Sequence, residues 1–90
     1  MERRHQDNLL NRLEEAWLNG VSHISWDELY HWYGVDKIAA RTYRDLEDRW
    51  TALTDDKAGR LMKVEGRGGM FVFGESSAAK VDPKHVLNQI

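Results

Sequence analysis

Three cationic side chains recur along one side of the segment that spans residues 36–53. On a helix of about 3.6 residues per turn, Lys37, Arg41 and Arg44 fall on one face. The opposite face is apolar and carries Ala39, Tyr43, Leu46, Trp50 and Leu53. A guanidinium group binds phosphate or guanine through paired hydrogen bonds, whereas a Lys ammonium binds phosphate as a point charge. The pattern therefore predicts a helix that is buried on one side and offers anion-binding groups on the other.

A second group of basic residues surrounds a glycine-rich connection. The runs 61–64 and 70–73 are β-prone, and the residues between them include three glycines, which predicts a hairpin with Arg67 near its tip. Arg60 and Lys63 could support Arg67 from the first strand. The alternative is that the glycines only permit the turn and Arg67 is solvated, because Glu65 in the same loop would repel phosphate.

Metal binding and catalysis find little support in the sequence. His23, Glu28 and His31 form the one cluster that suggests a metal, but zinc sites need three or four ligands at defined spacing. We expect Glu28 to cap its own helix instead, and we expect neither a metal nor another cofactor. Cysteine is absent, and so are nucleophile-elbow and phosphate-cradling motifs. We therefore expect a protein that is not an enzyme and has no small-molecule substrate.

The elements that would position these residues follow from periodicity and capping signals. A first amphipathic helix is predicted from about Asp7 to Asn19, with residues 1–6 fraying and Gly20 ending the helix. A short extended segment, 21–25, leads to the capping box Ser25-Trp26-Asp27-Glu28, which starts a second helix that ends at Gly34. Asp36 is expected to cap the helix 36–53, and a loop at 54–59 precedes the hairpin.

Aromatic side chains are expected to supply much of a small core. Trp17, Trp32 and Trp50 recur at helical spacing on apolar faces and are predicted to be buried, whereas Trp26 is predicted to be exposed. In the second hairpin strand Phe71 and Phe73 alternate with other apolar residues, so neither face is clearly the wet one. Either a helix or a partner must cover such a hairpin.

This order of elements resembles that of winged helix-turn-helix domains. The residues that carry the resemblance are 24–29, the turn 34–36 and the hairpin 61–73, and the likeness extends over residues 7–75. The resemblance implies an α+β fold, with three helices and a C-terminal hairpin wing in residues 1–75. Residues 76–90 would form a tail, in which Asp82-Pro83 favours a short terminal helix. The stretch 73–82 is also similar to the post-wing stretch of phage excisionases, which are small winged-helix proteins that bend DNA.

The resemblance implies sequence-specific binding of double-stranded DNA. The third helix would enter the major groove, and the wing would reach a minor groove or a phosphate. The residues expected to contact DNA are Lys37, Ala40, Arg41, Arg44, Arg60, Lys63 and Arg67. The implied setting is transcription regulation or a mobile-element process such as excision. The apolar residues on both faces of the hairpin and the possible terminal helix suggest a homodimer.

The overall charge leaves a second interpretation open. The chain carries 13 Lys and Arg against 15 Asp and Glu, a net charge of −2, which favours a winged-helix module that binds protein and not DNA. Charged residues make up 31% of the chain, and no apolar run is long enough to span a bilayer. Together with the lack of cysteine, this leads us to expect a cytoplasmic protein without a membrane partner.

Overall fold

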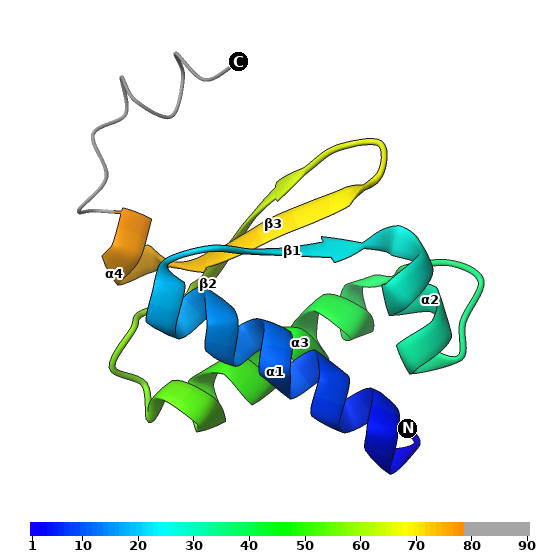
Figure 1. Ribbon diagram of the computed structural model, residues 1–90, viewed down its shortest axis with the longest axis horizontal. Helices are drawn as coiled ribbons and strands as arrows, with labels where there is room; N and C mark the ends of the chain where they lie inside the picture. The colour runs from blue at the N-terminus through cyan, green and yellow to red at the C-terminus, as the bar shows by residue number, and fades with distance from the viewer. Residues whose placement is uncertain (79–90) are drawn as a thin grey trace.

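A three-stranded antiparallel sheet lies on one side of a group of helices (Figure 1). The computed structural model describes residues 1–78. The elements, in chain order, are α1 (Arg3–Asn19), β1 (Ser22–Ser25), α2 (Trp26–Tyr33), α3 (Ala40–Thr54), β2 (Leu61–Glu65), β3 (Gly69–Gly74) and α4 (Glu75–Ala78). The fold is therefore a small α+β domain with three main helices, as the sequence predicts. The predicted terminal helix in the tail lies outside the described residues.

The central strand of the sheet is β3, which pairs with β1 on one side and with β2 on the other. Ile24 lies opposite Met70, and Val64 lies opposite Phe71. Met70 and Val72 are buried on the face that meets the helices, which we call the inner face. Phe71 is 50% exposed on the other face, which we call the outer face. Among residues 1–78, helices thus cover only one side of the hairpin.

The core is built from one face of each helix and the inner face of the sheet. Trp50 is fully buried, and its indole N–H donates a hydrogen bond to the Gly59 carbonyl at 3.2 Å. Trp32 is also buried, so both tryptophans confirm the prediction. The prediction for Trp17 is wrong, because Trp17 is 39% exposed. The buried stripe of α1 runs through Leu9, Leu13 and Ala16, and Trp17 lies about 100° further round the helix.

The first residues of the chain are helical and do not fray as predicted. α1 begins at Arg3, and His5 on its first turn is buried. The His5 ring meets the His31 ring of α2 edge to face at 4.5 Å, and its Nε2 lies 3.2 Å from a Glu2 carboxylate oxygen. Packing against α2 therefore starts α1 at Arg3, before Asp7, where the apolar periodicity of the sequence predicts its beginning.

The connection between α2 and α3 is longer than predicted. α2 ends at Gly34, which has the left-handed conformation (φ 64°) expected of it, but α3 begins only at Ala40. Asp36 does not cap α3; Ala39 is the N-cap and makes no side-chain cap. Ile38 packs against the core from this connection, and this burial outweighs the local signal at Asp36. Ala39 is consequently exposed, and Lys37 lies in the connection instead of on the helix.

An ion pair joins α1 to the capping box of α2. Both capping-box hydrogen bonds are present, since Ser25 Oγ accepts from the Glu28 N–H and the Glu28 carboxylate accepts from the Ser25 N–H. Arg12 donates to the same carboxylate at 3.1 and 2.6 Å, and it also donates to the His23 carbonyl at 2.7 Å. Burial raises the pKa of Glu28, but the hydrogen bonds from Ser25 and Arg12 outweigh it and leave this pKa lowered.

The segment that follows the hairpin is helical for one turn. α4 follows β3 directly. The Glu75 N–H donates to the Arg60 carbonyl at 2.9 Å, and the Ser76 N–H donates to the Ala58 carbonyl at 3.1 Å. These two bonds hold the turn against the loop that enters β2.

Gly69 lets β1 and β3 approach, which predicts a selective effect of alanine in the hairpin. A Cβ at Gly69 would lie 2.3 Å from the Ile24 carbonyl oxygen, so Gly69→Ala must displace backbone. We expect it to lower the free energy of unfolding by roughly 1–3 kcal/mol. A Cβ at Gly68 would meet no atom within 4 Å, so Gly68→Ala should change the free energy of unfolding by less than about 0.5 kcal/mol. Urea unfolding, monitored by tryptophan fluorescence, measures the stability of both variants. Equal losses of stability in Gly69→Ala and Gly68→Ala would contradict a special role for Gly69.

The lowered pKa of Glu28 predicts a loss of stability in acid. A carboxylate whose pKa is lower in the folded state stabilises the fold above its unfolded pKa, and this contribution disappears as pH falls through the folded pKa. Glu28→Gln should therefore lower the free energy of unfolding at pH 7, by about 1–2 kcal/mol, and flatten its fall between about pH 5 and pH 3.

Glu14→Gln is the matched control for this change, because Glu14 is exposed and has no ion-pair partner within residues 1–78. Urea unfolding across this pH range should show a flattened profile for Glu28→Gln alone. If both variants follow the wild-type profile, the Arg12–Glu28 pair does not contribute as described.

Candidate nucleic-acid interface

Four of the predicted contact residues lie at the start of α3. Ala40, Arg41 and Arg44 are exposed on its first two turns, and Lys37 is exposed in the connection that precedes it. Within residues 1–78, none of the three cations has a carboxylate oxygen within 4.0 Å. Thr42, between these residues in the sequence, is buried. Arg41 and Arg44 at the start of α3 and Lys37 just before it thus offer solvent three positive charges that are unpaired within residues 1–78.

The acidic residues of α3 are mostly engaged with neighbouring side chains. Asp45 accepts hydrogen bonds from Tyr33 Oη at 2.6 Å and from Arg49 Nε at 2.7 Å. Burial raises the pKa of Asp45, but these two bonds outweigh it and leave this pKa lowered. Glu47 pairs with Arg60 at 3.2 Å, while Asp48 is exposed. The cationic surface is therefore confined to the part of α3 before Asp48.

The basic residues of the hairpin have two different environments. Arg67 is exposed at the tip and makes no ion pair in the described part of the chain. Arg60 Nε contacts Glu47 on α3 at 3.2 Å, and Lys63 pairs with Glu65. The Lys63 ammonium also lies 4.6 Å from the centre of the Tyr43 ring. Arg60 and Lys63 therefore serve contacts between α3 and β2, whereas Arg67 is left free.

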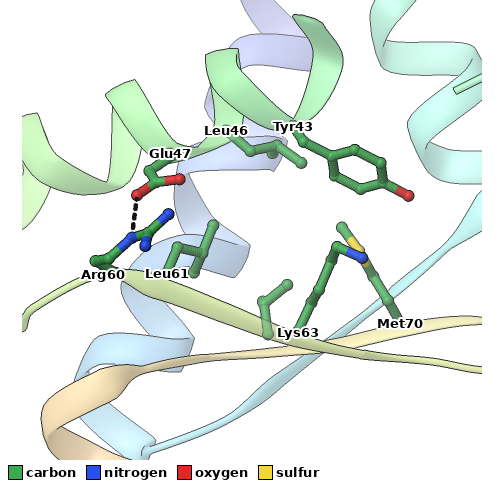
Figure 2. A pocket seen from close by; sticks show the side chains of 8 residues that line it. Tyr43, Leu46, Glu47, Arg60, Leu61, Lys63 and Met70 are labelled. Atoms are coloured by element: carbon green, nitrogen blue, oxygen red, sulfur yellow. Dashed lines mark hydrogen bonds and ion pairs between the residues drawn. The ribbon is translucent and has the colours of Figure 1, made fainter. Parts of the chain in front are cut away.

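A small pocket of about 200 Å³ lies between α3 and β2 (Figure 2). Leu46, Leu61 and Met70 give it apolar walls, and Tyr43, Glu47, Arg60 and Lys63 form its polar edge. The Arg60–Glu47 ion pair crosses one end of the pocket in this view. Its volume suits a few water molecules or one small side chain.

Tyr43 ties the hairpin to the first turns of α3. Its hydroxyl donates to Glu65 Oε1 at 2.8 Å, at the end of β2 nearest the hairpin tip. Burial, followed by this bond and the Glu65 charge, raises the pKa of Tyr43 to about 12. Hydrogen bonds from Lys63 and from Tyr43 lower the pKa of Glu65. The Tyr43–Glu65 hydrogen bond thus joins the helix that carries Arg41 and Arg44 to the hairpin that carries Arg67.

Trp26 holds the hairpin from the other side. Its indole N–H donates to the Gly66 carbonyl at 2.8 Å, and its ring packs against the core, so it is only partly exposed and not free as predicted. The Trp26 backbone N–H also bonds to the Gly68 carbonyl at 3.3 Å. The hairpin loop is therefore fixed by the start of α2 as well as by α3.

Sequence reasoning missed the hydroxyl contacts that organise this site. The helical pattern predicts Tyr43 only as a core residue, and it does not predict the hydrogen bond between Tyr33 and Asp45. The spacing of Asp45 and Arg49, four residues apart on one helix, is a local signal that could have indicated their ion pair.

The cluster His23, Glu28 and His31 does not form a metal site. Glu28 is occupied by Arg12 and Ser25, and residues 1–78 contain no group of three or more side chains placed to hold a metal ion. None of the helices in this part of the chain is both long and apolar enough to cross a membrane.

Comparisons with known proteins give no match. No protein-family model fits the chain, and neither a curated protein nor a solved structure is significantly similar to it.

The raised pKa of Tyr43 predicts a loss of stability in alkali. Unfolded tyrosine ionises near pH 10, whereas folded Tyr43 keeps its proton to about pH 12. The unfolded state therefore gains stability first, and the contribution of Tyr43 to folding is lost as pH rises from about 10 to 12. Tyr43→Phe should lower the free energy of unfolding at pH 7 by about 1 kcal/mol and make its decline above pH 10 less steep.

Tyr30→Phe is the comparison variant, because its hydroxyl makes no hydrogen bond to a side chain within the described residues. The Tyr30 charge makes the smallest contribution to the raised pKa of Tyr43, so we expect a smaller change of profile than for Tyr43→Phe. Urea unfolding of the three proteins between pH 9 and pH 12 measures the effect. Parallel profiles for wild type and Tyr43→Phe would disprove a structural role for the Tyr43–Glu65 bond.

Proposed function

We propose that this protein is a winged-helix protein that binds double-stranded DNA through the start of α3 and the β2–β3 hairpin. The order of helices and strands is compatible with a winged-helix arrangement, in which α3 is the reading helix and the hairpin is the wing. The observation that carries the proposal is the set of exposed cations, Lys37, Arg41 and Arg44, none of which is paired within residues 1–78.

The chemistry of each residue suggests its role on DNA. Arg41 and Arg44 can address guanine in the major groove or bind phosphate with paired hydrogen bonds. Lys37, just before the helix, suits a phosphate, and the Ala40 methyl group suits a thymine methyl group. Because Ala39 provides no side-chain cap, the first amides of α3 are also available to a phosphate.

The hairpin would add one contact to the same duplex. Arg67 at its tip is free to reach a minor groove or a phosphate. Arg60 and Lys63 are already paired with glutamates, so we assign them mainly to holding the hairpin against α3. The proposed role is transcription regulation or a mobile-element process such as excision, in the cytoplasm.

A second candidate function is supported by a different surface. The outer face of the sheet exposes Met62, Val64 and Phe71, and exposed apolar patches often bind proteins. With a net charge of −2, the chain would then be a winged-helix module that binds a protein partner and no DNA.

Charge reversal at the start of α3 tests the DNA proposal. We expect Arg41→Glu with Arg44→Glu to weaken binding to a duplex, selected from a random pool at low salt, by at least about 30-fold, since two phosphate or base contacts become repulsive. Fluorescence anisotropy measures affinity, and circular dichroism and thermal unfolding confirm that the variant is folded.

The control is Ala52→Glu with Lys57→Glu, which makes a similar negative change of charge at exposed residues at and just beyond the other end of α3. We expect it to weaken binding by less than about 3-fold, through long-range electrostatics alone. For wild type, log affinity should fall with log salt with a slope of about −3 to −4 per protomer, as expected for four phosphate contacts. Equal effects of the two double variants would refute the site, and no duplex binding at low salt would favour the protein-binding module.

A further inference from the structure

We infer that the outer face of the sheet is a homodimer interface, on which a second copy of this chain packs its own outer face. The two sheets would form the middle of the dimer, with the helices of each copy on the outside. This inference does not depend on DNA binding, because α3 lies against the inner face of the sheet (Figure 1).

The outer face consists of two short rows of side chains that cross the three strands. In one row, His23 of β1, Phe71 of β3 and Val64 of β2 are partners in register. In the other row, Phe73 lies opposite Met62, and Val21, which directly precedes β1, continues the row on the far side. Five of these six residues are apolar, so the rows form one apolar patch.

The exposure of this patch is large for residues of this type. Val64 is 56% exposed, Phe71 is 50% exposed, Val21 is 46% exposed and Met62 is 40% exposed. No helix in the described part of the chain covers them. Burying apolar surface stabilises an assembly in proportion to its area, so a cover for this face is favoured.

Charge favours a second copy as that cover. None of the six residues is Asp, Glu, Lys or Arg. The charged residues of β2, Lys63 and Glu65, lie on the inner face, where both contact Tyr43. In a two-fold dimer each patch meets its own copy, so a charge in the patch would face a like charge. This patch avoids that repulsion.

The β2 edge of the sheet is a less favourable place for association than its outer face. β2 is an edge strand, and charged residues that point inward from an edge strand oppose the addition of another strand. Lys63 and Glu65 are such residues. Face-to-face packing leaves their ion pair in place, and it brings the sheets to about 10 Å, the usual distance in a sandwich.

The size of the face sets the expected strength. A face of three short strands provides less than the roughly 800 Å² per partner of a standard protein interface. We therefore expect a dissociation constant of about 10–200 μM, so the dimer is a concentration-dependent species. Sedimentation velocity between about 5 and 500 μM should show a shift from monomer to dimer.

Substitution of exposed residues tests the surface without disturbing the core. Val64→Glu with Phe71→Glu should leave the protein folded and monomeric up to about 500 μM, because each two-fold contact would then place carboxylates together. Ala52→Glu is the matched control, since Ala52 is exposed on α3, on the other side of the sheet, and should leave the dimer unchanged.

The lack of cysteine allows a second measurement on the folded protein. A single thiol from Phe71→Cys, at the centre of the patch, should cross-link to its mate with a thiol-specific homobifunctional reagent, whereas one from Ala52→Cys should not. Wild type that stays monomeric at about 500 μM overturns the inference. A dimer that persists in the variant Val64→Glu with Phe71→Glu also overturns it. So does a monomeric Phe71→Cys variant whose thiol does not react, because another segment of the same chain would then cover this face.

Discussion

The bidentate ion pair between Arg12 and Glu28 sets the position of the sheet relative to the helices. Glu28 belongs to the capping box that starts α2, and Arg12 also binds the carbonyl of His23 in β1. Three elements therefore meet at one partly buried carboxylate. Because β1 runs directly into α2 and pairs with β3, the hairpin is located through this contact as well. Removal of Arg12 would leave the Glu28 carboxylate with its capping-box bonds alone, so α1 would lose its charged contact with α2 and β1.

The parts of the fold that the sequence predicts correctly are those encoded by neighbouring residues. The capping box at Ser25 and Glu28, the end of α2 at Gly34 and the glycine-rich hairpin are local signals, and the structure contains all three. The errors occur where distant packing decides. His5 extends α1 because it meets His31, and α3 starts late because Ile38 packs against the core before the helix begins. Neither contact can be read from a helical period.

The candidate site also has one part that the sequence predicts and one part that it does not. The exposure of Arg41 and Arg44 follows from the helical pattern, since the opposite side of α3 carries Leu46 and Trp50. Which cations remain unpaired does not follow from it. Arg60 meets Glu47 across 13 residues of sequence, and Tyr43 meets Glu65 across 22. These contacts depend on the angle between α3 and the hairpin, which only the folded chain defines.

Strand β2 reverses the usual polarity of a sheet that is covered on one side. Such a sheet normally directs apolar residues toward its helices and polar residues toward water. In β2, Lys63 and Glu65 lie on the side of α3, while Met62 and Val64 point away from it. The polar residues are used there because Tyr43 offers a hydroxyl and a ring to them. The apolar residues are consequently displaced to the outer face. Strand β2 thus fixes the hairpin against α3 and contributes Met62 and Val64 to the patch that we assign to a second copy. In β3 the residues of both faces are apolar, so the sequence of that strand does not reveal which face is wet.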